Sequence, residues 1–93
     1  MEEDEPLVLP SALKRIADGV TEDNLLHAYA NQLGQLTDEH HPDGPMTLYV
    51  GPSRSGMVLL EVGVPTRQWH GMTVIVHGMK ARPWLLKELG LAK

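Results

Sequence analysis

The stretch that decides the fold is Thr73–Pro83, which reads TVIVHGMKARP. It opens with four β-branched residues, which favour strands, and their apolar character predicts a buried strand. His77 lies inside this run, and Lys80 and Arg82 follow where it ends. An ionisable side chain on a buried strand either costs free energy or belongs to a functional site. His77, Lys80 and Arg82 are therefore the first candidates for functional residues.

The chain has 93 residues, 42% of them hydrophobic, and no cysteine. This length predicts a single domain at residues 6–93, preceded by a flexible acidic leader at residues 1–5. The lack of cysteine excludes disulfides and thiolate zinc sites and agrees with a reducing compartment. No apolar stretch reaches the roughly 18 residues that span a bilayer, and the leader is acidic, so the sequence predicts a soluble, cytoplasmic protein with no membrane partner.

Charge is divided unevenly along the chain. Residues 1–46 carry two basic and ten acidic side chains, a balance of −8, whereas residues 47–93 carry six basic and two acidic side chains, a balance of +4. One interpretation is that the two halves face different partners, or face each other. A solvated acidic helical face is the other interpretation of the first half, and both stay open.

The first half of the chain predicts a short edge strand followed by two helices. Prolines enclose the apolar residues of segment 6–10, and proline is tolerated at the edges and ends of strands. Ser11 is a candidate N-cap for a short helix that stops at Gly19, and Thr21 is a candidate N-cap for a second helix with an acidic first turn. Apolar residues recur at helical spacing along this second helix: Leu25, Tyr29, Leu33 and Leu36.

A polar connection at residues 37–45 joins the helical half to the second half. It contains His40 and His41 among carboxylates, which raises the question of a metal site. Adjacent histidines in a connection rich in proline and glycine lack the fixed spacing that metal ligands need. We therefore favour a loop and expect neither a metal nor another cofactor.

The second half alternates with the period of a strand. Strands are expected at residues 46–50, 57–64 and 73–78, and turns join them into a three-stranded antiparallel meander. A short C-terminal helix follows, because Pro83 suits a first helical turn and Gly90 suits a stop. If the meander has no bulge, its aliphatic face packs on the helices and three other side chains project together from the opposite face: Tyr49, Glu61 and His77.

Four segments carry a resemblance to a known family. They read DGVTEDNLLHAY at residues 18–29, LYVGPSRSG at 48–56, LEVGV at 60–64 and VIVHGMKAR at 74–82. Their order and spacing, over about residues 12–86, resemble the BrnT-like branch of the RelE-like bacterial toxins. The resemblance implies an α+β, RelE-like fold with a short N-terminal edge strand, two helices, a three-stranded antiparallel meander and a short C-terminal helix.

The resemblance also implies a function. Such a toxin belongs to a type II toxin–antitoxin system and is an endoribonuclease of the mRNA interferase type, a hydrolase that inhibits translation. The implied partners are a cognate antitoxin protein and an RNA substrate, which is cut free or on the ribosome.

The residues themselves suit metal-independent RNA cleavage, which needs a base for the 2′-hydroxyl proton, an acid for the leaving oxygen and cations around the phosphate. Glu61 is the candidate base, and His77 is the candidate acid because histidine titrates near neutral pH. Tyr49 is a candidate to orient the phosphate or to stack on a base. Basic residues are the candidate phosphate ligands, with arginine preferred for bidentate contact: Arg54, Lys80 and Arg82.

A structural interpretation of the same residues stays open. Glu61 can instead pair with Arg82 or Arg67 across the sheet. Trp84 and the leucines that follow it suit core packing or a patch that faces an antitoxin. On this interpretation the chain is a non-catalytic protein–protein interaction module of the same fold.

Overall fold

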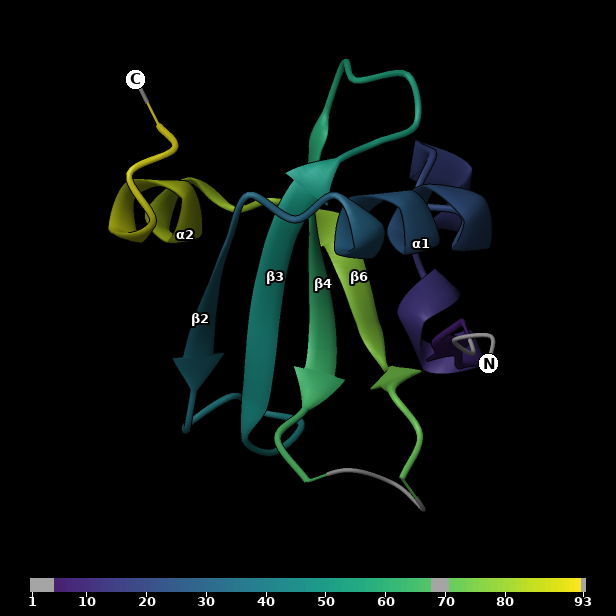
Figure 1. Cartoon of the computed structure of the whole chain (residues 1–93), viewed down its shortest axis with the longest axis vertical. Helices are drawn as coiled ribbons and strands as arrows, with labels where there is room; N and C mark the ends of the chain where they lie inside the picture. The colour runs from purple at the N-terminus through teal and green to yellow at the C-terminus, as the bar shows by residue number, and fades with distance from the viewer. Residues whose placement is uncertain (1–4, 68–70, 93) are drawn as a thin grey trace.

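A four-stranded antiparallel sheet is the centre of the fold (Figure 1). The computed structural model describes residues 5–67 and 71–92, so most of the predicted acidic leader, part of the predicted connection between the strands at 57–64 and 73–78, and the last residue lie outside the described residues. The strands lie in the order β2-β3-β4-β6. Their bounds are Gly34–Asp38 for β2, Met46–Pro52 for β3, Leu59–Pro65 for β4 and His77–Lys80 for β6.

The stretch Thr73–Pro83 forms two short strands rather than the predicted single strand. Its first part, β5 (Val74–Ile75), pairs in parallel with β1 (Leu7–Val8), the predicted edge strand. Its second part, β6, pairs antiparallel with β4. Val76 separates the two and donates its backbone N–H to the Gly63 carbonyl oxygen at 2.9 Å. The chain divides here because β5 belongs to the two-stranded sheet with β1, whereas β6 belongs to the four-stranded sheet.

The predicted helix from Ser11 to Gly19 is wrong, because two 3-10 turns occupy this segment. They are η1 (Pro10–Leu13) and η2 (Ile16–Asp18). Ser11 is not an N-cap, since it lies inside η1 and its hydroxyl donates to the Val76 carbonyl oxygen at 2.9 Å. Gly19 does end the second turn, with a left-handed φ of 87°.

The two α-helices begin where the sequence predicts. In α1 (Glu22–Ala30), the Thr21 side chain accepts the Asn24 backbone N–H at 3.2 Å, as an N-cap does. In α2 (Pro83–Glu88), Pro83 occupies the first turn. Within the described residues, no helix is long and apolar enough to cross a membrane.

The second helix is shorter than predicted, and strand β2 replaces its C-terminal part. The apolar repeat continues through Leu33 and Leu36, but Leu33 is 57% exposed and Leu36 lies in β2, paired with Leu48. Burial alternates along β2, as in a strand with one covered face. The pairing with β3 therefore outweighs the helical spacing, and the sheet has four strands rather than the predicted three.

Cross-strand pairs decide which side chains share a face of the sheet, because paired residues of antiparallel strands point the same way. Glu61 is paired with Val50 and with Met79, and His77 is paired with Gly63, two positions further along β4. Glu61 and His77 therefore lie on one face, as the alternation predicts.

Tyr49 lies on the opposite face, because it is paired with Val62. The prediction that Tyr49 projects with Glu61 and His77 is wrong. The predicted register between β3 and β4 differs from the structure by one residue, and a shift of one residue moves every side chain of a strand to the other face.

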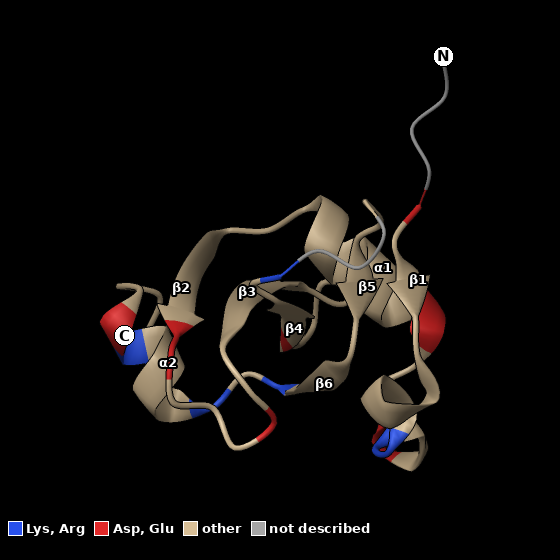
Figure 2. Cartoon of the chain, turned by 90° about the horizontal axis from the view of Figure 1, so that it is seen from below, with Lys and Arg blue, Asp and Glu red and all other residues tan. Residues whose placement is uncertain are grey.

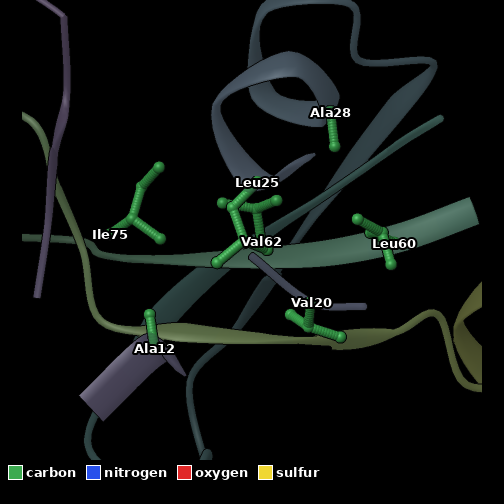
Figure 3. Close-up of a cluster of buried hydrophobic side chains, with 7 residues drawn as sticks. All are labelled: Ala12, Val20, Leu25, Ala28, Leu60, Val62 and Ile75. Atoms are coloured by element: carbon green, nitrogen blue, oxygen red, sulfur yellow. The ribbon is translucent and has the colours of Figure 1, made fainter. Parts of the chain in front are cut away.

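Each face of the sheet has its own apolar cluster. On the first, which we call the α1 face, helix α1 covers the sheet. Figure 3 shows the buried side chains of the cluster there, to which η1, β5 and the residue before the N-cap of α1 also contribute: Ala12, Val20, Leu25, Ala28, Leu60, Val62 and Ile75. On the second, the α2 face, Leu85 of α2 packs with three strand residues: Met46, Leu48 and Val50. The α+β fold class is thus confirmed, with helices on both sides of one sheet.

Candidate functional site

Glu61 is the centre of the candidate site. It lies in β4 on the α2 face, and its side chain is 0% exposed. Its carboxylate accepts a hydrogen bond from Nε2 of His77 at 2.8 Å. Arg82 donates to the same carboxylate from Nη2 at 2.7 Å, from Nε at 3.1 and 3.2 Å and from its backbone N–H at 3.0 Å. A buried carboxylate is costly unless it is paired, and this one is paired through both oxygens.

The pKa of Glu61 is set by opposing effects. Burial raises this pKa, but the hydrogen bonds from His77 and Arg82 and the guanidinium charge lower it by more. The result is a pKa of about 2. Glu61 is therefore ionised at neutral pH and acts only as an acceptor. It follows that Nε2 of His77 carries a proton, which leaves Nδ1 as the nitrogen of that ring that can exchange one.

Arg82 is held where β6 passes into α2. It is the residue before Pro83, in the extended conformation that precedes proline, and it occupies the N-cap position of α2. Its guanidinium carbon lies 5.2 Å from the centroid of the Trp84 ring, a cation–π distance. The Arg82 side chain is 34% exposed, and its Nε and Nη2 hold Glu61.

The space for His77 comes from Gly63. A Cβ at Gly63 would meet Sδ of Met46 and would lie 2.7 Å from Cβ of His77, closer than real side chains approach. The missing side chain therefore lets the imidazole lie over β4 and reach Glu61. Its side chain remains 17% exposed.

Gly63→Ala is expected to displace the His77 ring and to destabilise the fold by about 1–3 kcal/mol, the usual cost of overpacking a filled site. Urea denaturation measures the loss, and the ring displacement changes the His77 imidazole NMR signals. Gly34→Ala is the control, because the atoms nearest to its Cβ would be those of the flexible Leu89 side chain, at 3.4–3.6 Å. Unchanged His77 signals in Gly63→Ala would contradict this explanation of the glycine.

His41 also belongs to the site, although the sequence does not predict it there. It is 9% exposed, and its ring packs edge-to-face with that of His77 at a centroid distance of 5.2 Å. Its Nδ1 accepts the Asp43 backbone N–H at 3.1 Å, so in this tautomer Nε2 carries the proton. The available signal was the sequence HPDG, because proline, aspartate and glycine build a tight turn that fixes the preceding residue; Gly44 has a φ of 101° there.

Three of the predicted site residues lie elsewhere. Tyr49 is on the α1 face, and Lys80 is paired with Leu60 on that same face, exposed at the end of β6. Arg54 is exposed after β3 and pairs with Asp23 of α1 at 2.7 Å. The structure thus brings together Glu61, His77 and Arg82 but not the other three.

The surroundings of the site carry both signs of charge. Figure 2 shows basic positions at the end of β6 and before α2, close to the acidic connection that follows β2. Hydrogen bonding to Glu61 raises the pKa of Arg82, and the carboxylate of Asp38 acts in the same direction. In residues 5–67 and 71–92, no group of three or more His, Asp or Glu side chains is placed to hold a metal ion.

Comparisons with known proteins add nothing to this geometry. No protein-family model, no curated protein and no solved structure matches the chain.

Proposed function

We propose that the chain is a RelE-like toxin that cleaves RNA without a metal ion, inhibits translation and is neutralised by a protein antitoxin. The observation that supports this most is the buried carboxylate of Glu61, which fixes one imidazole and one guanidinium on the same face of the sheet. A fixed imidazole can act as a general base and a fixed guanidinium can bind the phosphate, which are two of the roles that metal-independent phosphodiester cleavage needs.

In this mechanism Glu61 is a positioning residue rather than the base. Its side chain has no exposed surface, and its pKa of about 2 makes it a weak proton acceptor. It holds Nε2 of His77, so Nδ1 receives the proton from the 2′-hydroxyl of the RNA. This is the role of the carboxylate in a carboxylate–histidine pair, which orients the ring and stabilises the imidazolium that forms.

The remaining groups bind the phosphate. Free N–H groups of Arg82 and Nε2–H of His41 donate to the non-bridging oxygens, where negative charge increases in the transition state. The 2′-oxygen attacks phosphorus, the bond to the 5′-oxygen breaks, and this oxygen takes a proton from water. The products are a 2′,3′-cyclic phosphate and a 5′-hydroxyl end.

His77→Ala is expected to reduce RNA cleavage by about 10²–10⁴-fold, the usual contribution of a general base. The assay uses a 5′-labelled RNA in EDTA and identifies the cyclic phosphate end, with circular dichroism to verify the fold. His40→Ala is the matched control, since His40 is an exposed histidine. Cleavage retained in His77→Ala, or lost on addition of EDTA to the parent, would overturn the mechanism.

A second candidate function is a non-catalytic protein-binding module. The ion pair between Glu61 and Arg82 favours it, because two nitrogens of the Arg82 side chain already donate to Glu61. An ion pair of this kind stabilises the fold without taking part in catalysis. Under this alternative the parent chain binds an antitoxin-like protein but cuts no RNA, and His77→Ala leaves that binding unchanged.

A further inference from the structure

A hollow of about 150 Å³ lies on the α1 face of the sheet, on the other side from Glu61. It forms because α1 has only nine residues. Ala28 of α1 packs on Gly51 near the end of β3, and the helix ends two residues later, so the beginning of β3 is not covered by α1. The hollow is bounded by the last turn of α1, the strands β3 and β4, and the segment that leads into β5.

The side chains that line this hollow are mostly hydrogen-bond donors. Two tyrosines, three threonines and one arginine contribute to the wall: Tyr29, Tyr49, Thr47, Thr66, Thr73 and Arg67. Within residues 5–67 and 71–92, the rest of the wall is apolar or proline, and no aspartate or glutamate takes part. In a chain with a formal net charge of −4, a concave surface whose described lining holds a cation and no carboxylate is suited to an anion.

The rings of Tyr29 and Tyr49 pack against each other in the wall of the hollow. Their ring centroids are 5.0 Å apart with an interplanar angle of 77°, an edge-to-face contact that holds both rings in place. Burial raises the pKa of Tyr49, and neighbouring Tyr29 acts in the same direction. The Tyr49 hydroxyl therefore keeps its proton at neutral pH and remains a donor.

A packing defect would have a different lining. A second hollow beside β1 and β5, of about 220 Å³, is lined, in the part of the chain that the structure describes, by apolar side chains: Leu7, Leu9, Pro65, Val74 and Val76. The tyrosines and two of the threonines of the polar hollow are instead half-buried, and Arg67 is exposed, so their donor groups stay accessible to a ligand from solvent. The volume of the polar hollow is about half or less of a typical drug-sized site of 300–1,000 Å³, so it suits a group of a few heavy atoms rather than a large ligand.

We propose that this hollow binds a phosphate group, with Arg67 as the charged ligand and the tyrosine and threonine hydroxyls as neutral donors. The phosphate is either free inorganic phosphate or the terminal phosphate of a nucleotide or RNA. The site is separate from the one around Glu61 and does not depend on the proposed ribonuclease function.

The test is a binding titration of the full chain by NMR and calorimetry with inorganic phosphate, a nucleoside 5′-monophosphate, and 5′-phosphorylated and 5′-hydroxyl forms of one oligonucleotide. Saturable binding of at least one phosphate ligand is expected, with shifts centred on Tyr29, Tyr49 and Thr47. A preference for the phosphorylated oligonucleotide over its 5′-hydroxyl form identifies the nucleic-acid source, and binding of inorganic phosphate alone identifies the free anion.

Arg67→Gln is expected to weaken this binding by about 10–100-fold, because a charge-assisted hydrogen bond is lost. Tyr49→Phe is expected to weaken it by about 3–10-fold, the value of a neutral hydrogen bond. Arg15→Gln is the matched control, since Arg15 is an exposed arginine outside the hollow. His77→Ala separates this site from the other, because it leaves phosphate binding at the hollow unchanged.

Two results would overturn the proposal. One is the absence of saturable binding of all four ligands to the folded parent chain. The other is equal affinity of the parent and Arg67→Gln, or a loss in His77→Ala as large as that in Arg67→Gln, which would assign the anion to the site around Glu61. Thermal melts of each variant verify that a loss of binding is not a loss of folding.

Discussion

Glu61→Ala is expected to lower the free energy of unfolding by about 3–5 kcal/mol at neutral pH, the cost of breaking a buried ion pair by removing one partner. The substitution leaves Arg82 and His77 with donors that face each other across an empty space. Urea denaturation measures the change. Glu39→Ala is the control, because Glu39 is an exposed carboxylate on the β2–β3 connection.

A further variant separates the ion pair from the loss of volume. In Glu61→Gln the side chain keeps its size but loses its charge, so its instability relative to the parent reports the charge alone. The difference in the free energy of unfolding between the parent and Glu61→Gln should become smaller as the pH falls. Since the pKa of Glu61 is lowered from 4.5 to about 2, its stabilisation is fully present above about pH 4.5 and is lost as the pH falls through 2, a change of about 3 kcal/mol. A difference that stays constant from pH 6 to pH 2 would contradict the ion pair as its source.

Gly51→Ala is expected to have a comparably large effect for a different reason. A Cβ at this position would overlap the carbonyl oxygen of Ala28 and would lie 2.8 Å from its carbonyl carbon. These are backbone atoms of α1, so the helix itself has to move off the sheet. Overpacking usually costs 1–3 kcal/mol, and more where backbone must shift; we expect about 3 kcal/mol or more.

The measurement is the midpoint and slope of urea denaturation for Gly51→Ala beside Gly34→Ala. Neither glycine has a left-handed φ, so the two variants carry the same backbone substitution and differ in what the new methyl group meets. Equal stability of the two variants would show that α1 does not need the close approach to β3.

The sequence predicts several parts of the site for clear physical reasons. Strand alternation places Glu61 and His77 on one face, and this holds because both strands lie in one antiparallel sheet without a bulge between them. Pro83 marks the start of α2, which fixes the position of Arg82 just before it. These predictions depend only on local pattern.

Tyr49 shows what local pattern cannot decide. Strand β4 is buried on both faces around Glu61, and a strand of this kind has no polar face to define its orientation. The register between β3 and β4 is instead set by the turn at residues 53–58, where the Ser53 N–H donates to the Val58 carbonyl oxygen. A one-residue difference in that turn is enough to exchange the face on which Tyr49 lies.

Strand β2 and His41 were missed for related reasons. Leu36 continues the helical repeat of α1, and only its pairing with Leu48 makes it a strand residue. The position of His41 depends on the tight turn that follows it and on the ring of His77, which is 36 residues away in the sequence. Neither partner is visible from the segment alone, because long-range pairing decides both.

The small parallel pair of β1 and β5 has a consequence for the order of folding. Its backbone hydrogen bonds join Leu7 to Thr73 and Leu9 to Ile75, and the Ser11 hydroxyl reaches a carbonyl 65 positions away in the sequence. Contacts of such large sequence separation form only after the entropy of closing a long loop has been lost. The β2–β3–β4 hairpins can form from near neighbours, so we expect the N-terminal segment to be the last part of the chain to join the fold and the first to leave it.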